Sequence, residues 1–148
     1  MSLQDRVSQE IKAAMLARDA GRLGTLRLLK SALGYMQIEK KVDQLPDADV
    51  IQAVQREIKK RRDSIEQYQA AGRAEQAASE AAEITVLETL LPKAFSPAEL
   101  EALVQSTIAE LGATSKKDMG PVMKAIQAKA AGRADGKTIS TIVSKLLP

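Results

Sequence analysis

Apolar residues recur along this chain three or four residues apart, and this spacing is the feature that most constrains its fold. Leu3, Val7, Ile11 and Met15 follow one another at intervals of four and define one face of a helix. No stretch alternates polar and apolar residues with the period of two expected of a half-buried strand. The spacing therefore predicts an all-α protein.

Composition predicts the kind of core these helices share. Hydrophobic residues make up 45% of the 148 residues, but aromatic residues make up only 2%. The apolar content suffices for a packed core, which must consist of Ala, Leu, Ile, Val and Met. Ala is the strongest helix former, whereas strands favour aromatic and β-branched residues. Composition thus favours helices that pack against one another through aliphatic side chains.

Turn and capping residues divide the chain into seven expected helices. Six helix starts are marked by Ser2, Asp19, Pro46, Ser96, Asp118 and Asp135, and the remaining helix is expected from about Arg73 to Leu90. Three helix ends are marked by Gly72, Gly112 and Gly132. Ser115 with Asp118 also fits a capping box, but Pro121 in the first turn favours Asp118 as the cap.

Two prolines predict the boundary between two parts of the chain. Pro92 and Pro97 lie five residues apart, and a helix cannot continue through them. We expect an N-terminal four-helix subdomain over residues 1–92 and a C-terminal three-helix bundle over residues 96–148.

Several classes of chemistry lack the residues they require. The chain has no cysteine and no histidine, so it has no thiolate and no imidazole base or ligand. Asp43, Asp47 and Asp49 fit a polar turn and a helix start better than a metal site. Glu80 and Glu83 share a helix face and are expected to be solvated. We expect no catalytic residues, no metal and no cofactor.

We expect neither a signal peptide nor a membrane span. The first residues contain neither a basic segment nor an apolar segment of the kind that a signal peptide requires. No apolar run approaches the roughly 20 residues needed to span a bilayer. We therefore expect a cytoplasmic protein.

Positive charge is concentrated near the C-terminus. Residues 1–92 carry 14 basic and 14 acidic residues, whereas residues from Ala113 onward carry 7 basic and 2 acidic residues. The two acids, Asp118 and Asp135, are both expected as helix caps. The basic residues of this cluster are Lys116, Lys117, Lys124, Lys129, Arg133, Lys137 and Lys145. Composition leaves open whether they form a solvated surface or a phosphate-binding surface.

A secondary basic cluster lies in the long third helix. It consists of Lys59, Lys60, Arg61 and Arg62, preceded by Arg56 and followed by Arg73. Four consecutive residues cover all sides of a helix, so at least one must approach the core or a neighbouring helix. The cluster is either a binding surface or a face that pairs with the acidic fourth helix, and we favour the pairing.

The turn Gly132-Arg133-Ala134-Asp135-Gly136-Lys137 has two alternative interpretations. Two glycines four residues apart followed by a lysine are typical of a nucleotide-phosphate loop. No strand is predicted before this turn, however, although Gly136-Lys137-Thr138 has the Gly-Lys-Thr ending of that loop. We favour a connection between two helices in which Gly132 ends one helix, Asp135 caps the next and Gly136 permits a tight backbone.

Several motifs resemble the YqeY family. The middle of the chain carries Lys59-Lys60-Arg61-Arg62-Asp63-Ser64, Tyr68, Ala71-Gly72-Arg73 and Leu90-Leu91-Pro92. The last third carries Asp118-Met119-Gly120-Pro121-Val122-Met123, the turn Gly132–Lys137, and Ile142-Val143 with Leu146-Leu147. This last third is similar to the tail domain that YqeY proteins share with the GatB component of the glutamine-dependent aminoacyl-tRNA amidotransferases.

The resemblance implies an accessory role in translation. Because the amidotransferase tail contacts tRNA, the resemblance implies that tRNA or another structured RNA binds the C-terminal cluster of basic residues. A second implied role is docking on an amidotransferase or other translation protein. A third is carbon–nitrogen ligase activity with glutamine as amido-N-donor, but the catalytic parts of the amidotransferase have no counterpart here, and we expect no such activity.

Overall fold

The computed structural model describes residues 1–148 and contains seven α-helices and no strand. The all-α prediction is thereby confirmed. The chain divides into two compact units, Met1–Leu91 and Pro92–Pro148. The helices of the first unit are α1 (Leu3–Leu16), α2 (Ala20–Lys40), α3 (Asp47–Ala70) and α4 (Ala74–Glu88). Those of the second are α5 (Pro97–Leu111), α6 (Met119–Ala130) and α7 (Gly136–Leu146), with a 3₁₀ turn, Lys116–Asp118, before α6.

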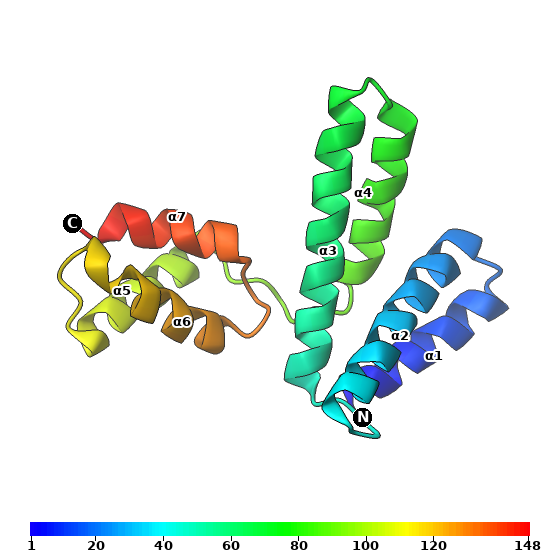
Figure 1. Ribbon diagram of the computed structural model, residues 1–148, viewed down its shortest axis with the longest axis horizontal. Coiled ribbons are helices and arrows are strands. Elements are labelled where there is room, and N and C mark those ends of the chain that lie inside the picture. Colours follow the sequence, from blue (N-terminus) through cyan, green and yellow to red (C-terminus); the bar gives the residue numbers. More distant parts are fainter. The chain divides into compact units, whose positions relative to one another are not determined.

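Two helical hairpins form the first unit. Figure 1 shows α1 beside α2 and α3 beside α4, and the apolar faces of the four helices meet in one aliphatic core. Leu26, Leu29, Val50, Val54 and Leu87 are fully buried in that core. Because the core holds no aromatic side chain, the helices approach one another through branched aliphatic and Ala side chains.

Side chains at the helix ends hold the first unit together. Ser2 and Asp19 cap α1 and α2 by accepting hydrogen bonds from the backbone amides of Asp5 and Arg22. Asp47 accepts from the Leu3 amide at 2.9 Å, which ties the start of α1 to the start of α3. Arg6 Nη2 donates to the Thr89 carbonyl at 2.8 Å, so a cation satisfies a carbonyl at the end of α4.

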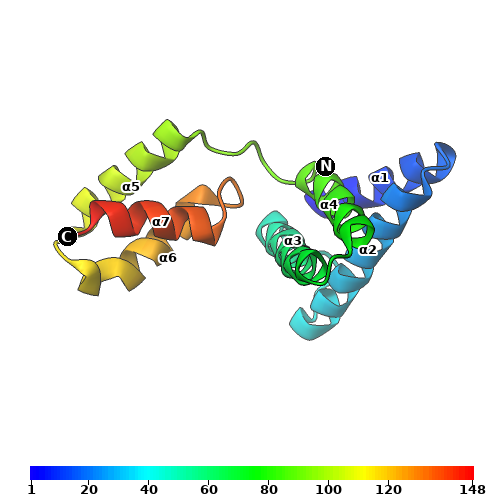
Figure 2. The same ribbon diagram turned by 90° about the horizontal axis from the view of Figure 1, so that it is seen from above.

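The second unit is a three-helix bundle with its own core. Val104, Val122, Ile126, Ile139 and Val143 are buried where α5, α6 and α7 pack together, and Figure 2 shows α7 alongside the other two helices. Ser96 caps α5 with Pro97 at the first helical position, and Asp135 caps α7. None of the seven helices combines the length and the apolar character needed to cross a membrane.

Three predictions about helix faces and helix ends differ from the structure. Met15 is 52% exposed, and Ala14 takes its place in the core, so the buried face of α1 ends one residue earlier than expected. Ser115 and Asp118 form the capping box of the 3₁₀ turn, and the Asp118 side chain does not cap α6 as we expected. The left-handed residue that ends α6 is Ala131, with φ of 43°, and Gly132 follows it with φ of 85°.

Candidate nucleic-acid interface

Five lysines of the C-terminal cluster are exposed and form no ion pair in the structure. Two lie in the 3₁₀ turn, one lies on α6, and two lie on α7. They are Lys116, Lys117, Lys124, Lys137 and Lys145. Lys116 also lies beside the chain end, because its backbone amide donates to the Pro148 carbonyl at 3.2 Å. These five side chains are therefore available to an anionic ligand.

Lys129, a sixth member of the cluster, is engaged within the unit. Its Nζ lies 2.6 Å from Oε2 of Glu110 and donates to the hydroxyl of Thr107 at 3.2 Å. Thr107 is fully buried and donates its own hydroxyl hydrogen to the Leu103 carbonyl. Lys129 thus joins α6 to α5 and satisfies a buried hydroxyl, so it contributes less positive charge to the surface than the sequence indicated.

Arg133, the seventh member, holds the segment that precedes α5. Its Nε donates to the Lys93 carbonyl at 2.9 Å, and its guanidinium lies 3.7 Å from the centre of the Phe95 ring. The Phe95 amide donates to the Arg133 carbonyl at 2.9 Å. Glu99 lies 3.8 Å from Nη2 of the same guanidinium. Arg133 therefore anchors residues 93–95 to the turn between α6 and α7.

The acidic residues of the second unit are largely occupied by local contacts. Asp118 accepts hydrogen bonds from the amides of Thr114 and Ser115, and Asp135 accepts from the Thr138 amide at 2.7 Å. Glu99 and Glu110 pair with Arg133 and Lys129. These four acids therefore have partners other than the five exposed lysines.

The turn from Gly132 to Lys137 connects two helices. It follows α6 and leads directly into α7, with no strand before it. Gly132 has a left-handed backbone, which favours glycine, and Asp135 caps α7. A Cβ at Gly136 would lie 3.6 Å from Nε2 of Gln127, which is an ordinary contact. The interpretation as a helix connection is confirmed, and the nucleotide-loop alternative lacks its strand. The expected role of Gly136 is wrong, because its backbone is not left-handed and leaves room for a Cβ.

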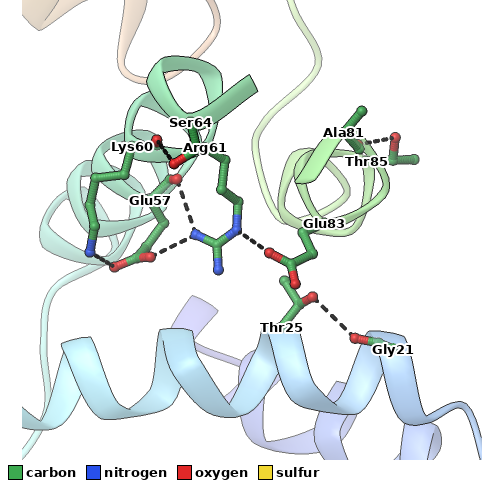
Figure 3. A network of polar contacts seen from close by, with 9 residues as sticks. All are labelled: Gly21, Thr25, Glu57, Lys60, Arg61, Ser64, Ala81, Glu83 and Thr85. Carbon is green, nitrogen blue, oxygen red and sulfur yellow. Dashed lines mark hydrogen bonds and ion pairs between the residues drawn. The ribbon is translucent and has the colours of Figure 1, made fainter. Parts of the chain in front are cut away.

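The secondary basic cluster separates into one buried residue and several exposed ones. Arg61 is buried between α3 and α4, where its Nε contacts Glu83 at 2.8 Å and its Nη1 contacts Glu57 at 2.7 Å (Figure 3). Lys60 also lies 3.4 Å from Glu57, but its side chain is 72% exposed. The remaining members of the cluster, Arg56, Lys59, Arg62 and Arg73, are all exposed.

The charge of Arg61 is stabilised by its two carboxylates. Burial on its own lowers the pKa of the Arg61 guanidinium, because removal from water disfavours the charged form. Hydrogen bonds and charges of Glu57 and Glu83 outweigh that effect, and the pKa is raised above its ordinary value. The expected pairing of this cluster with the acidic fourth helix is therefore present at Arg61, which belongs to the packing between α3 and α4. The prediction that Glu83 is solvated is wrong, because Glu83 is the partner of Arg61 on α4.

The aspartates of the turn before α3 also have structural partners. Asp47 accepts from the Leu3 amide, and Asp49 forms an ion pair with Lys40 at 2.8 Å. These contacts agree with their interpretation as residues of a polar turn and a helix start.

One exposed feature was not anticipated from the sequence. Leu28, Tyr35 and Ile38 project from α2 with 56%, 76% and 75% of their surface exposed. Tyr35 also borders a shallow depression of about 280 Å³ between α2 and α3, lined in part by Glu39 and Arg56. Leu26, Leu29 and Leu33, spaced three and four residues apart, form the buried face of α2, but this spacing does not indicate that apolar residues also occupy the opposite side.

Fold and surface together define a two-unit helical protein with a group of exposed lysines on its C-terminal bundle. The family model described as Yqey-like protein matches residues 4–147. The chain therefore belongs to the YqeY family, and the match extends over both units. None of the curated proteins compared with the chain matches it.

Proposed function

We propose that this YqeY protein is an accessory factor that binds tRNA or another folded RNA through its second unit and has no catalytic activity of its own. The observation that carries the proposal is the set of five exposed lysines at Lys116, Lys117, Lys124, Lys137 and Lys145. Lysines that neutralise phosphates supply most of the affinity of sequence-independent nucleic-acid binding. The cytoplasm, which contains tRNA, is the compartment in which we propose that it acts.

The proposed contact is with phosphates and RNA shape, and not with stacked bases. Proteins that bind single strands stack bases on aromatic side chains. Phe95 is the one aromatic residue of the second unit, and the Arg133 guanidinium covers one face of its ring. Folded RNA, by contrast, is recognised largely through its backbone and shape.

A charge-removal experiment tests the proposal. Replacing the five lysines with Gln should abolish the shift of total tRNA in a native gel at low salt and preserve the helical circular-dichroism spectrum. The matched control removes five exposed cations from the first unit, namely Lys12, Arg18, Arg27, Lys30 and Lys41. Equal binding by both variants, or no binding by the wild-type protein at low salt, would contradict RNA binding through the second unit.

A second candidate function is docking on a protein of the translation or amidotransferase machinery. The exposed side chains of Leu28, Tyr35 and Ile38 on α2 favour it, since apolar patches of this kind mark protein contacts. A purified amidotransferase should then bind after nuclease treatment, and Tyr35→Glu should prevent binding while Arg27→Glu on the neighbouring surface should not. Binding that disappears with nuclease would favour RNA instead.

A further inference from the structure

The outer face of α7 combines lysines with hydroxyl side chains. Lys137, Thr141, Ser144 and Lys145 are all exposed. Their spacing of four, seven and eight residues from Lys137 places them on one face of the helix. The opposite face carries Ile139 and Val143, which are buried in the core of the bundle. The packing of α7 thus directs the lysines and hydroxyls to the surface.

No acidic residue interrupts this face. The sequence of α7 contains neither Asp nor Glu. At 1.5 Å per residue, the two lysines are separated by about 12 Å along the helix axis. The hydroxyls of Thr141 and Ser144 lie between them. Lys, Ser and Thr side chains are the groups that proteins commonly use to contact the phosphates of nucleic acids.

Two further lysines are brought to the C-terminal end of α7. The amide of Lys116 donates to the carbonyl of Pro148, three residues beyond Lys145. The 3₁₀ turn that carries Lys116 and Lys117 therefore lies at the same end of the bundle as Lys145. These residues are separated by about thirty positions in the sequence, and only the fold places them together.

We propose that the outer face of α7, extended by Lys116 and Lys117, contacts the phosphates of a double-helical RNA stem. This assignment rests on the RNA binding proposed above and adds the surface and the form of the RNA. The charge of the face is complementary to a phosphate backbone. The absence of aromatic side chains on the face favours a stem over a single strand, because a single strand needs stacking partners.

The lysines of the face are tested against lysines outside the five-lysine set. Lys137→Gln/Lys145→Gln removes two cations from the face, and Lys30→Gln/Lys93→Gln removes two exposed cations elsewhere. With a 20-base-pair RNA duplex as probe, we expect the first variant to bind roughly tenfold more weakly and the salt slope to decrease by about 2. The second variant should lose no more than about threefold. Circular dichroism checks that both remain folded.

The hydroxyls are tested without any change of charge. Thr141→Ala/Ser144→Ala should weaken binding of the same duplex by roughly threefold to tenfold, on the order of one net hydrogen bond, because the Thr141 hydroxyl already donates to the Lys137 carbonyl at 2.9 Å in the free protein. The matched control, Ser106→Ala/Thr114→Ala, removes two exposed hydroxyls outside α7 and should leave affinity within about twofold. A smaller loss for the α7 variant than for its control would contradict a role for the hydroxyls.

The outcomes separate the two proposals. If the wild-type protein binds neither the duplex nor total tRNA at low salt, the proposed function and the α7 assignment both fail. If it binds, but the two lysine variants lose affinity equally, the α7 assignment alone is overturned. A 20-nucleotide single strand bound as tightly as the duplex would overturn the assignment to a stem and leave RNA binding intact.

Discussion

Arg61 on α3 donates from Nε to Oε2 of Glu83 on α4 at 2.8 Å, while its side chain is only 8% exposed. Glu57, one turn earlier on α3, accepts from the same guanidinium. A buried charge requires partners that replace its hydration, and these two carboxylates provide them. The network therefore ties α3 to α4 in one particular register.

Removal of Arg61 should destabilise the first unit strongly. Arg61→Ala leaves the buried Glu57 without its closest cation, and we expect a loss of about 3 kcal/mol in the free energy of unfolding. Lys60→Ala removes an exposed partner of the same carboxylate and should cost about 0.5 kcal/mol or less. Urea denaturation followed by circular dichroism compares the two variants. Similar losses would show that burial of Arg61 contributes little.

The two cores should respond separately to cavity-forming substitutions. Leu26 and Val104 are both fully buried, and they belong to cores that share no residue. Leu26→Ala should cost about 3 kcal/mol and Val104→Ala about 2 kcal/mol. Native-state hydrogen exchange should accelerate in residues 1–91 for the first variant and in residues 92–148 for the second. Acceleration across the whole chain in either variant would contradict this separation.

Arg133 should act through its planar guanidinium more than through its charge. Arg133→Lys retains the cation but cannot reproduce both the stacking on Phe95 and the hydrogen bond to the Lys93 carbonyl. We expect a loss of about 1 kcal/mol in the stability of the second unit. Hydrogen exchange should show reduced protection of the Phe95 amide, which donates to the Arg133 carbonyl. Unchanged protection would indicate that Arg133 does not hold this segment.

The left-handed residue at the end of α6 offers a stabilising substitution. Ala131 has φ of 43°, a conformation that is unfavourable for a residue with a Cβ. Ala131→Gly should therefore raise the stability of the second unit by about 0.5–1 kcal/mol. The same replacement at Ala128, inside α6, should lower stability by about 1 kcal/mol. Thermal melts of the two variants should shift in opposite directions.

Much of the fold could be predicted because its signals are local. Ser2, Asp19, Ser96 and Asp135 cap helices as expected, since capping depends on a side chain and an amide three residues away. Met15 was assigned wrongly because periodicity identifies a helix face but not where the neighbouring helix ends. Ser115 and Asp118 differed from expectation because the short turn they cap has no periodic signal.

The candidate interface was predictable only in outline. Counting charge located the excess of cations after Ala113, but it treated seven residues as equivalent. The fold places Glu110 beside Lys129 and Glu99 beside Arg133, which are 19 and 34 positions apart. No local pattern reveals such pairs. For the same reason, no local pattern predicts the hydrogen bond from the Lys116 amide to the Pro148 carbonyl.

The sequence by itself determined that this chain is helical, where most helices begin, and which segment carries surplus positive charge. These properties depend on residues within one or two turns of one another. Tertiary structure alone decided that Arg61 is buried, that Lys129 and Arg133 have partners, and that five lysines remain exposed. The reason is physical: burial and ion pairing depend on distances between helices, which the packing of the aliphatic cores establishes.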